Sequence, residues 1–155
     1  MASPPRIDIA EATSPEDVAA VKQLFIEYAD YLDENLCFQG FDAEMDTFPA
    51  IYKQLLLARV DGEAAAAIGL KDLGQGICEM KRLYARPAFQ GLGLGRALCR
   101  RLLDNARGFG FSAMRLDTLP RLEAAIAIYR ELGFVEIDEY YDNPIDGVIY
   151  MEAPL

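Results

Sequence analysis

The sequence predicts an α/β (α+β) fold in which helices flank a twisted, mixed sheet. The chain has 155 residues, of which 52% are hydrophobic, as is typical of one globular domain with a substantial core. Apolar residues recur either at alternate positions or at every third or fourth position, which indicates strands and helices respectively. The resulting order is β-α-α-β-β-β-α-β-α-β-β. A run of antiparallel strands thus precedes a β-α-β unit, and we expect one domain over residues 1–155.

Two helices are expected in the first third of the chain. Ser14 followed by Pro15 and two acids is typical of a helix start, because serine caps the free N–H groups and acids suit the positive end of the helix. Apolar residues continue at helical spacing as far as Leu32. The stretch Phe41–Phe48 predicts a short second helix, which Pro49 ends.

Seven strands and two further helices are expected in addition. The dipeptide Asp61-Gly62 between two apolar runs is a strong signal of a hairpin turn. An apolar helical stripe predicts a helix that ends at Gly108, and Arg121–Leu132 predicts a last helix closed by Gly133. The expected strands are Arg6–Ala12, Gln54–Val60, Ala64–Leu70, Ile77–Ala85, Ser112–Asp117, Phe134–Tyr140 and Val148–Glu152.

Composition excludes several classes of function. The net charge of −10 argues against nucleic-acid binding, which needs basic patches. This acidity could attract a cationic substrate, or it could serve solubility alone. The chain has no histidine and three widely spaced cysteines, so we expect no metal site and free, buried thiols. No apolar run approaches the ~20 residues of a membrane span, and no secretory signal is evident, so we expect a cytoplasmic protein without membrane contact.

A glycine-rich segment, QGLGLGR at residues 90–96, lies between an expected strand and an expected helix. Backbone N–H groups there, together with those of the first helical turn, can form a cradle for an anion. A Walker A loop is excluded because Gly95 is followed by Arg96 and Ala97 rather than by lysine and serine or threonine. A dinucleotide fingerprint needs GxGxxG, whereas the spacing here is GxGxG. A purely structural turn remains the alternative to an anion site.

Around this segment the sequence resembles the GNAT N-acetyltransferase family. The resemblance rests on a Q-x-x-G-x-G loop, on CEMKRLYARPAFQG before it, and on AAIAIYRELGF after it. It implies a mostly antiparallel sheet with a splayed central parallel strand pair, and acetyl-CoA as the acyl donor. It also implies that a bulged central strand and the glycine loop hold this donor. The cofactor-binding residues implied are Leu83, Tyr84, Ala85, Gln90, Gly91, Leu92, Gly93, Leu94, Gly95 and Arg96.

The resemblance further implies two catalytic residues. Glu79 would be the general base, acting directly or through water, and it is otherwise an ion-paired glutamate next to Lys81. Tyr129 would be the general acid near the thioester sulfur, and it is otherwise a core aromatic. The chain has no histidine, so other titratable groups must transfer these protons, and a carboxylate and a phenol can do so.

One position departs from the family pattern. Leu122 stands where many members carry an asparagine that contacts the pantetheine arm, so that contact must be lost or replaced. Arg121 could lie near the cofactor or simply at the surface of a helix start. The acceptor pocket is expected from Leu36–Asp42 and Glu139–Pro144, which mix aromatic and acidic residues.

Two functions therefore compete. The first is an enzyme that transfers acetyl from acetyl-CoA to a primary amine of a small molecule or peptide by direct attack. The second is a non-catalytic module that binds or senses acyl-CoA. The acceptor stays open among polyamines, amino acids, antibiotics, small aromatic amines and peptide N-termini, and a homodimer is expected only from the family.

Overall fold

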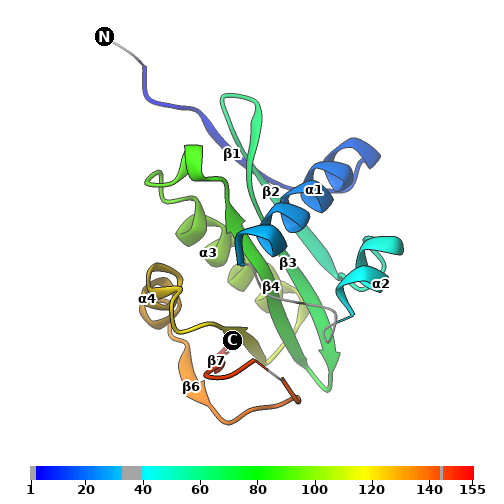
Figure 1. Cartoon of the computed structure of the whole chain (residues 1–155), viewed down its shortest axis with the longest axis vertical. Helices are drawn as coiled ribbons and strands as arrows, with labels where there is room; N and C mark the ends of the chain where they lie inside the picture. The colour runs from blue at the N-terminus through cyan, green and yellow to red at the C-terminus, as the bar shows by residue number, and fades with distance from the viewer. Residues whose placement is uncertain (1–2, 33–39, 144) are drawn as a thin grey trace.

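A computed structural model describes residues 3–32, 40–143 and 145–155, and these form the predicted order of elements (Figure 1). The helices are α1 (Pro15–Leu32), α2 (Phe41–Asp46), α3 (Leu94–Phe109) and α4 (Glu123–Glu131), with a short 3₁₀ turn, η2, at Pro87–Phe89. The strands are β1 (Ile7–Glu11), β2 (Gln54–Val60), β3 (Glu63–Gly74), β4 (Ile77–Ala85), β5 (Ala113–Thr118), β6 (Val135–Ile137) and β7 (Ile149–Pro154). The predicted mixed α/β architecture is thereby confirmed.

All these strands join one sheet in the order β1-β2-β3-β4-β5-β7-β6. Strands β4 and β5 are parallel, and the other neighbouring strands are antiparallel. Helix α3 connects β4 to β5, as a parallel pair requires. The expected central parallel pair in a mostly antiparallel sheet is confirmed.

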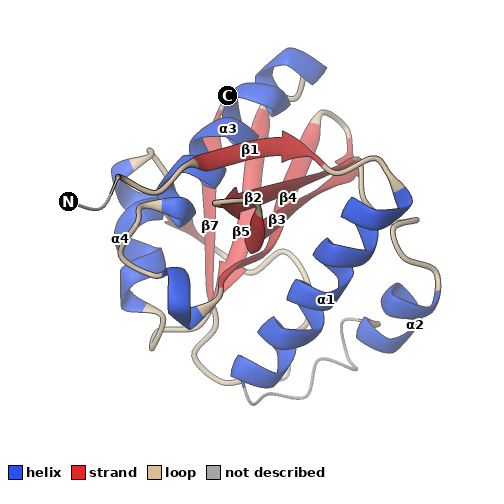
Figure 2. Cartoon of the chain, turned by 90° about the horizontal axis from the view of Figure 1, so that it is seen from above, coloured by secondary structure: helices blue, strands red, loops and turns tan. Residues whose placement is uncertain are grey.

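The helices cover both faces of this sheet. Figure 2 shows α1 and α2 on one side of the strands and α3 and α4 on the other. Each side has its own hydrophobic core: Phe25 and Leu55 belong to the core under α1, while Leu98 and Met114 belong to the core under α3. The α1/α2 layer leaves the lower part of β4 uncovered, and part of the candidate site lies there (Figure 1).

Local signals explain most element boundaries. Ser14 caps α1 as predicted, because its Oγ accepts a 3.1 Å hydrogen bond from the backbone N–H of Asp17. The predicted end of α3 at Gly108 is wrong. The helix continues to Gly110, whose φ of 91° allows the N–H of Phe111 to bond back to Ala106 at 3.2 Å.

Strand β6 is shorter than predicted. It ends at Ile137 rather than at Tyr140, and the chain beyond it leaves the sheet. The residues after Ile137 instead belong to a loop whose tyrosines turn back toward β4 and β5. The described part of this loop, residues 138–143 and 145–148, brings polar side chains to the open part of the sheet.

A β-bulge and a splay distinguish the centre of the sheet. Between Ala67 and Gly69 on β3 there is one residue, whereas β4 has two opposite it, Arg82 and Leu83. Arg82 has a φ of 62°, a left-handed conformation that is uncommon for a residue other than glycine. The parallel pairing of β4 with β5 ends at Glu79, so the rest of β4 diverges from its neighbour.

Other features bear on the excluded classes of function. Cys78 and Cys99 are buried free thiols, as expected, and Cys37 lies outside the described residues. Across residues 3–32, 40–143 and 145–155, no helix is long and apolar enough to cross a membrane.

Candidate active site

A groove opens on the sheet where β4 diverges from β5, between the glycine loop and α4. Its walls come from α1, the end of β4, the start of α3 and the start of α4. The predicted cofactor-binding residues that line it are Leu83, Tyr84, Ala85, Gln90, Gly91, Gly93, Leu94, Gly95 and Arg96. Leu92 does not line the groove, and its side chain is 37% exposed.

The glycine loop forms the predicted cradle at one end of this groove. Gly93 is the N-cap of α3 with a φ of 76°, and no side chain caps the helix start. The N–H of Ala97 bonds to the carbonyl of Gly93 at 3.1 Å, so the N–H groups of the preceding turn are left to face the groove. A Cβ placed on Gly91 or Gly93 would meet nothing within 4 Å. This open set of N–H groups at a helix N-terminus fits the pyrophosphate that the family resemblance implies.

The end of β4 presents backbone groups to the same groove. Arg86 donates its N–H to the carbonyl of Ala65 on β3 at 2.9 Å, so by alternation the backbone groups of Ala85 face the groove. The side-chain amide of Gln90 donates a 3.4 Å hydrogen bond to the Ala85 carbonyl. Beyond Glu79, strand β4 thus offers an edge that pairs with no strand on the β5 side, of the kind that an extended ligand can join.

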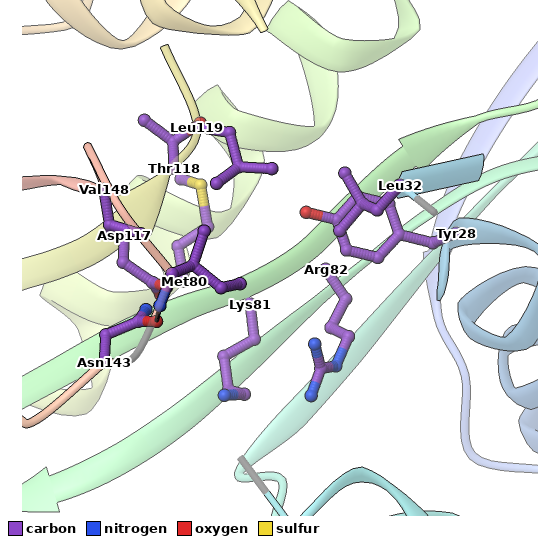
Figure 3. Close-up of a pocket in the computed structure, with 11 residues that line it drawn as sticks. Tyr28, Leu32, Met80, Lys81, Arg82, Asp117, Thr118, Leu119, Asn143 and Val148 are labelled. Atoms are coloured by element: carbon purple, nitrogen blue, oxygen red, sulfur yellow. Dashed lines mark hydrogen bonds between the residues drawn. The ribbon is translucent and has the colours of Figure 1, made fainter. Parts of the chain in front are cut away.

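A second hollow, the central cavity, lies at the point of the splay (Figure 3). It is enclosed by β4, β5, the end of α1 and the loop before β7. Figure 3 shows Tyr28 and Asp117 on opposite sides of the cavity. The lining residues are Tyr28, Leu32, Met80, Lys81, Arg82, Asp117, Thr118, Leu119, Asn143, Ile145 and Val148. Tyr28 also lines the groove and so stands where these two hollows meet.

A third hollow, the outer pocket, lies on the opposite side of Lys81. Its lining residues are Lys71, Leu73, Glu79, Lys81, Arg115, Tyr140 and Tyr141. Lys81 lines both the central cavity and the outer pocket. The groove, the central cavity and the outer pocket therefore follow one another, with Tyr28 and Lys81 at the two junctions.

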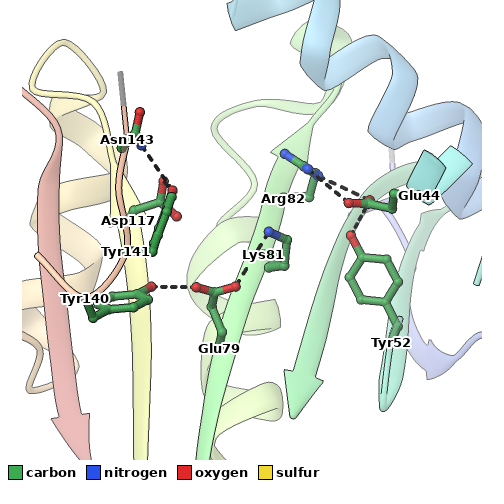
Figure 4. Close-up of polar contacts among 9 residues, drawn as sticks. All are labelled: Glu44, Tyr52, Glu79, Lys81, Arg82, Asp117, Tyr140, Tyr141 and Asn143. Carbon is green, nitrogen blue, oxygen red and sulfur yellow. Dashed lines mark hydrogen bonds and ion pairs between the residues drawn. The ribbon is translucent and has the colours of Figure 1, made fainter. Parts of the chain in front are cut away.

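Glu79 is buried and held by two partners (Figure 4). Its Oε2 accepts a 2.6 Å hydrogen bond from the hydroxyl of Tyr140, and its Oε1 lies 3.5 Å from Nζ of Lys81. Burial lowers the pKa of Lys81, while the charge of Glu79 raises it. The ion pair that the sequence left as an alternative for Glu79 is present, and it places this carboxylate on the wall of the outer pocket.

Tyr129 is both a core aromatic and a groove residue. Its side chain is 7% exposed, and its ring packs edge-on against Phe134 with centroids 5.8 Å apart. Within the described residues its hydroxyl has no hydrogen-bond partner, and no fully buried side-chain polar atom there is unsatisfied. The hydroxyl must therefore open into the groove that Tyr129 lines. Burial raises the pKa of Tyr129 well above its usual value, which keeps the phenol protonated.

The structure does not bring Glu79 and Tyr129 into one hollow. Glu79 borders the outer pocket and Tyr129 borders the groove, with the central cavity between them. An acceptor that enters from the outer pocket would pass Glu79 first, and a donor in the groove would pass Tyr129. The two residues thus lie on opposite approaches to the splay.

The loop before β7 supplies a second tyrosine–carboxylate pair beside the first (Figure 4). The hydroxyl of Tyr141 donates a 2.6 Å hydrogen bond to Oδ2 of Asp117 and accepts one of 3.0 Å from the side-chain amide of Asn143. The expected contribution of Glu139–Pro144 to the acceptor side is consistent with this geometry, although residue 144 lies outside the described residues. Most of Leu36–Asp42, residues 36–39, also lies outside them.

The β-bulge is held by a buried ion pair. The guanidinium of Arg82 binds the carboxylate of Glu44 on α2 at 3.0 Å and 3.3 Å, and Tyr52 donates a 2.5 Å hydrogen bond to the same carboxylate. The ring of Phe41 lies 5.0 Å below the guanidinium. Helix α2 thereby fixes the left-handed residue of the bulge, which lies on β4 beyond Glu79, where the pairing with β5 ends.

The last wall of the groove includes Leu122, the position that departs from the family pattern, and its neighbour Arg121. Leu122 lines the groove as an apolar group. Arg121 also lines it, and its guanidinium donates a hydrogen bond to the carbonyl of Leu32 at the end of α1. Arg121 thus borders the groove and bonds to the end of α1, while its contact with the cofactor stays a prediction.

Several residues of the site were not singled out from the sequence. The sequence places Tyr28 only on the apolar stripe of its helix, and it places Asp117 at the end of a strand, at a plausible distance for the acid of a dinucleotide fingerprint. Lys81 was considered merely as a partner for Glu79. Their common signal is a polar or phenolic group within a largely apolar element, which becomes informative only once the three hollows are known.

Comparisons with known proteins agree with this geometry. Residues 19–134 match the model of the Acetyltransferase (GNAT) family. An uncharacterized N-acetyltransferase of Schizosaccharomyces pombe is 36% identical over 161 residues, which cover 100% of this chain and 99% of that protein. An acetyltransferase from Streptococcus agalactiae has the same fold, with a TM-score of 0.77 and 20% identity over 96% of this chain and 98% of that one. The PaiA N-acetyltransferase of Thermoplasma acidophilum, solved in complex with coenzyme A, gives a TM-score of 0.71 and 17% identity over 97% and 99% of the two chains.

Proposed function

The chain belongs to the acetyltransferase (GNAT) family, and from this premise we propose that it transfers an acetyl group from acetyl-CoA to the primary amine of a small molecule. One observation carries the proposal. The parallel pairing of β4 with β5 ends at Glu79 and Arg115, and the diverging end of β4 leads to a glycine loop whose N–H groups face the same groove. An extended donor with a phosphate end fits such a groove, and its reactive end would then lie at the splay.

The residues of the cradle and of β4 would hold the donor. The N–H groups of the loop at residues 91–96 suit the pyrophosphate, and the backbone of Leu83 and Ala85 suits the amides of the pantetheine arm. Acetyl-CoA supplies an activated acyl group when bound. The chain's own task is to position this group and to manage the protons.

Two side chains would manage these protons. The carboxylate of Glu79 would accept a proton from the incoming ammonium at Oε1 or Oε2, directly or through a water, so that the amine can attack. The phenol of Tyr129 would hold a proton at its hydroxyl oxygen until the departing thiolate takes it. Because the pKa of Tyr129 is raised, that proton is present throughout the neutral range.

A small acceptor suits the central cavity better than a folded protein surface. The cavity is bounded by α1, by the splayed strands and by the loop before β7, so an amine must reach the splay between side chains such as Lys81 and Asn143. Enclosure of this kind is typical of small-molecule sites.

The proposal is tested by measuring thiol release from acetyl-CoA over a broad panel of amines, with the acetylated product identified by mass. We expect release with a subset of primary amines and none with secondary alcohols of matched shape. Thermal shifts with CoA and acetyl-CoA are measured in parallel. A shift without thiol release for any amine would instead favour the acyl-CoA-binding module, and a shift with NAD but none with acetyl-CoA would reject both.

A further inference from the structure

The outer pocket is locally cationic in a protein that is acidic as a whole. Its lining includes Lys71, Lys81 and Arg115 but a single carboxylate, that of Glu79. The chain carries a formal net charge of −10, so three cations around one pocket are not explained by overall composition. A local excess of one sign in a concave site concentrates ligands of the other sign.

Pairing within the pocket leaves one of these cations in excess. The guanidinium of Arg115 binds Oε1 of Glu152 at 2.9 Å, and Nζ of Lys81 lies 3.5 Å from Glu79. In the part of the chain that the structure describes, Lys71 has neither an ion pair nor a hydrogen bond from its ammonium. The surplus is therefore a single positive charge, and it belongs to Lys71.

The position of Lys71 relates this charge to the chemistry. Lys71 on β3 is the direct antiparallel partner of Glu79 on β4, so their Cα atoms are about 5 Å apart and their side chains share one face of the sheet. Lys81 contacts Glu79 from the other side and also lines the central cavity. An unpaired ammonium thus stands beside the carboxylate that we propose as the base.

We propose that the outer pocket selects acceptors that carry a carboxylate close to the reacting amine, as amino acids do, with the carboxylate bound by Lys71 and the amine directed to Glu79. This inference rests on the proposed function. A neighbouring cation and carboxylate are complementary to a zwitterion, because each charge of the ligand then meets its opposite. A phosphate monoester is disfavoured, since its second negative charge would have no matching surplus cation.

The experiment compares each acceptor with a neutral analogue of the same shape. L-Leucine, L-methionine and L-phenylalanine are each assayed beside their amides, with O-phosphoethanolamine as the phosphate arm. We expect the best acid to exceed its amide in kcat/KM by about tenfold or more, which corresponds to about 1.4 kcal/mol. The difference should lie mainly in KM for the acceptor, because Lys71 binds a carboxylate whose charge the acetyl transfer leaves unchanged.

Two variants assign the effect to Lys71. Lys71→Met should reduce kcat/KM for the acid about tenfold, through KM, while the amide keeps its parent value. Lys22→Met is the matched control, since it removes the same charge from α1 at a position that lines none of the three hollows. This control should leave both acceptors unchanged, which separates a local contact from a general change of net charge.

Several outcomes would overturn the inference while the proposed function stands. These are equal use of acids and amides by the parent, an equal loss for both in Lys71→Met, or a preference for O-phosphoethanolamine. If no amine releases thiol, the proposed function fails first. The inference is then decided by calorimetric titration of the CoA-loaded protein, where tighter binding of the acids than of the amides, abolished in Lys71→Met, supports it and equal binding rejects it.

Discussion

The hydroxyl of Tyr140 donates a 2.6 Å hydrogen bond to Oε2 of Glu79, across 61 residues of sequence. This bond closes the loop before β7 onto β4 and fixes the carboxylate at the wall of the outer pocket. The other carboxylate oxygen faces Lys81 at 3.5 Å. Glu79 is therefore oriented from two sides, as a group that must meet an incoming amine in one geometry should be.

Replacement of Glu79 by glutamine tests its role as base. Glutamine keeps the shape and can still accept the hydrogen bond of Tyr140, but it cannot take a proton. We expect Glu79→Gln to lower the rate at neutral pH by ~10²–10⁴-fold. The rate should recover partly at high pH, where free amine is abundant without a base. A pH–rate profile with one accepted amine measures this, and activity equal to the parent at every pH would remove Glu79 as base.

Tyr140→Phe and Tyr141→Phe form a matched pair that separates positioning from loop stability. Each variant removes a hydroxyl from the same loop. The hydroxyl of Tyr140 donates a 2.6 Å hydrogen bond to the carboxylate of Glu79, and the hydroxyl of Tyr141 donates one of the same length to Asp117. Hydrogen bonds to charged groups contribute about 1.5–3 kcal/mol, so both variants should lose stability in denaturant melts. Tyr141→Phe should lose more, because the hydroxyl of Tyr141 also accepts a hydrogen bond from Asn143. Only Tyr140→Phe should also lower kcat strongly, because only Tyr140 orients the carboxylate of Glu79. An equal kcat for both variants would show that Tyr140 merely holds the loop.

Tyr129→Phe tests the supply of a proton to the leaving thiolate. We expect a lower kcat at every pH, without the recovery at high pH that Glu79→Gln shows. Burial raises the pKa of Tyr129 well above its usual value and that of Tyr28 to about 12, so neither phenol titrates between pH 6 and pH 10. Tyr28→Phe, at the junction of groove and central cavity, is the control and should change mainly KM for the amine. A kcat for Tyr129→Phe equal to that of the parent would leave this tyrosine a core residue only.

How far the sequence predicts this molecule depends on the range of the interaction. Strands Gln54–Val60 and Ile77–Ala85 have the predicted bounds, because turn residues on both sides of each are local signals. The glycine cradle is equally local, since a loop and the helix start after it are continuous in sequence. The predicted end at Gly108 is wrong because two glycines lie near the end of α3, and only the second, Gly110, adopts the left-handed conformation that closes the helix.

The rest of the site could not be predicted because it depends on contacts between distant segments. Nothing near Tyr140 indicates that β6 ends at Ile137 so that this ring can reach Glu79. Nothing near Arg82 indicates that α2 supplies its counter-ion. The family resemblance implied a bulge and a splay at this place, and the structure adds the residues that hold them.

Substitutions at Gly95 test the cradle without disturbing its backbone. Gly93 has a positive φ, so a side chain there would strain the chain whether or not a ligand binds, whereas Gly95 has an ordinary helical conformation. A Cβ on Gly95 would lie 3.5 Å from Ile128 and 3.9 Å from Leu83, which is normal contact. Gly95→Ala should therefore fold well and still bind, while the two extra methyl groups of Gly95→Val should block the groove.

Thermal shifts measure the effect at Gly95. A ligand at ~100 times its dissociation constant adds about 2.7 kcal/mol of stability, which shifts a melting curve visibly. We expect acetyl-CoA to raise the melting temperature of the parent and of Gly95→Ala, and not that of Gly95→Val. NAD is the negative control. If Gly95→Val binds acetyl-CoA as tightly as the parent, the donor lies elsewhere.

The buried pair of Arg82 and Glu44 should matter far more to stability than the exposed pair of Arg96 and Glu131. In the buried pair the side chains are 4% and 3% exposed, and in the exposed pair they are 45% and 47% exposed. Glu44→Ala leaves a buried guanidinium without its main counter-ion, at a residue already held in a left-handed conformation. Removing one partner of a buried pair costs about 3–5 kcal/mol, whereas exposed pairs contribute about 0–1 kcal/mol. Urea denaturation of Glu44→Ala and Glu131→Ala measures the difference.

Arg82→Gly completes this comparison and ties stability to the groove. Glycine adopts a positive φ without strain, so this variant removes the guanidinium and about 1–3 kcal/mol of backbone strain together. We therefore expect Arg82→Gly to lose less stability than Glu44→Ala, although both break the same ion pair. Because the bulge shapes the part of β4 that lines the groove, both variants should also weaken the thermal shift with acetyl-CoA. Equal stability losses for Glu44→Ala and Glu131→Ala, with unchanged acetyl-CoA shifts, would mean that the bulge holds its shape without α2.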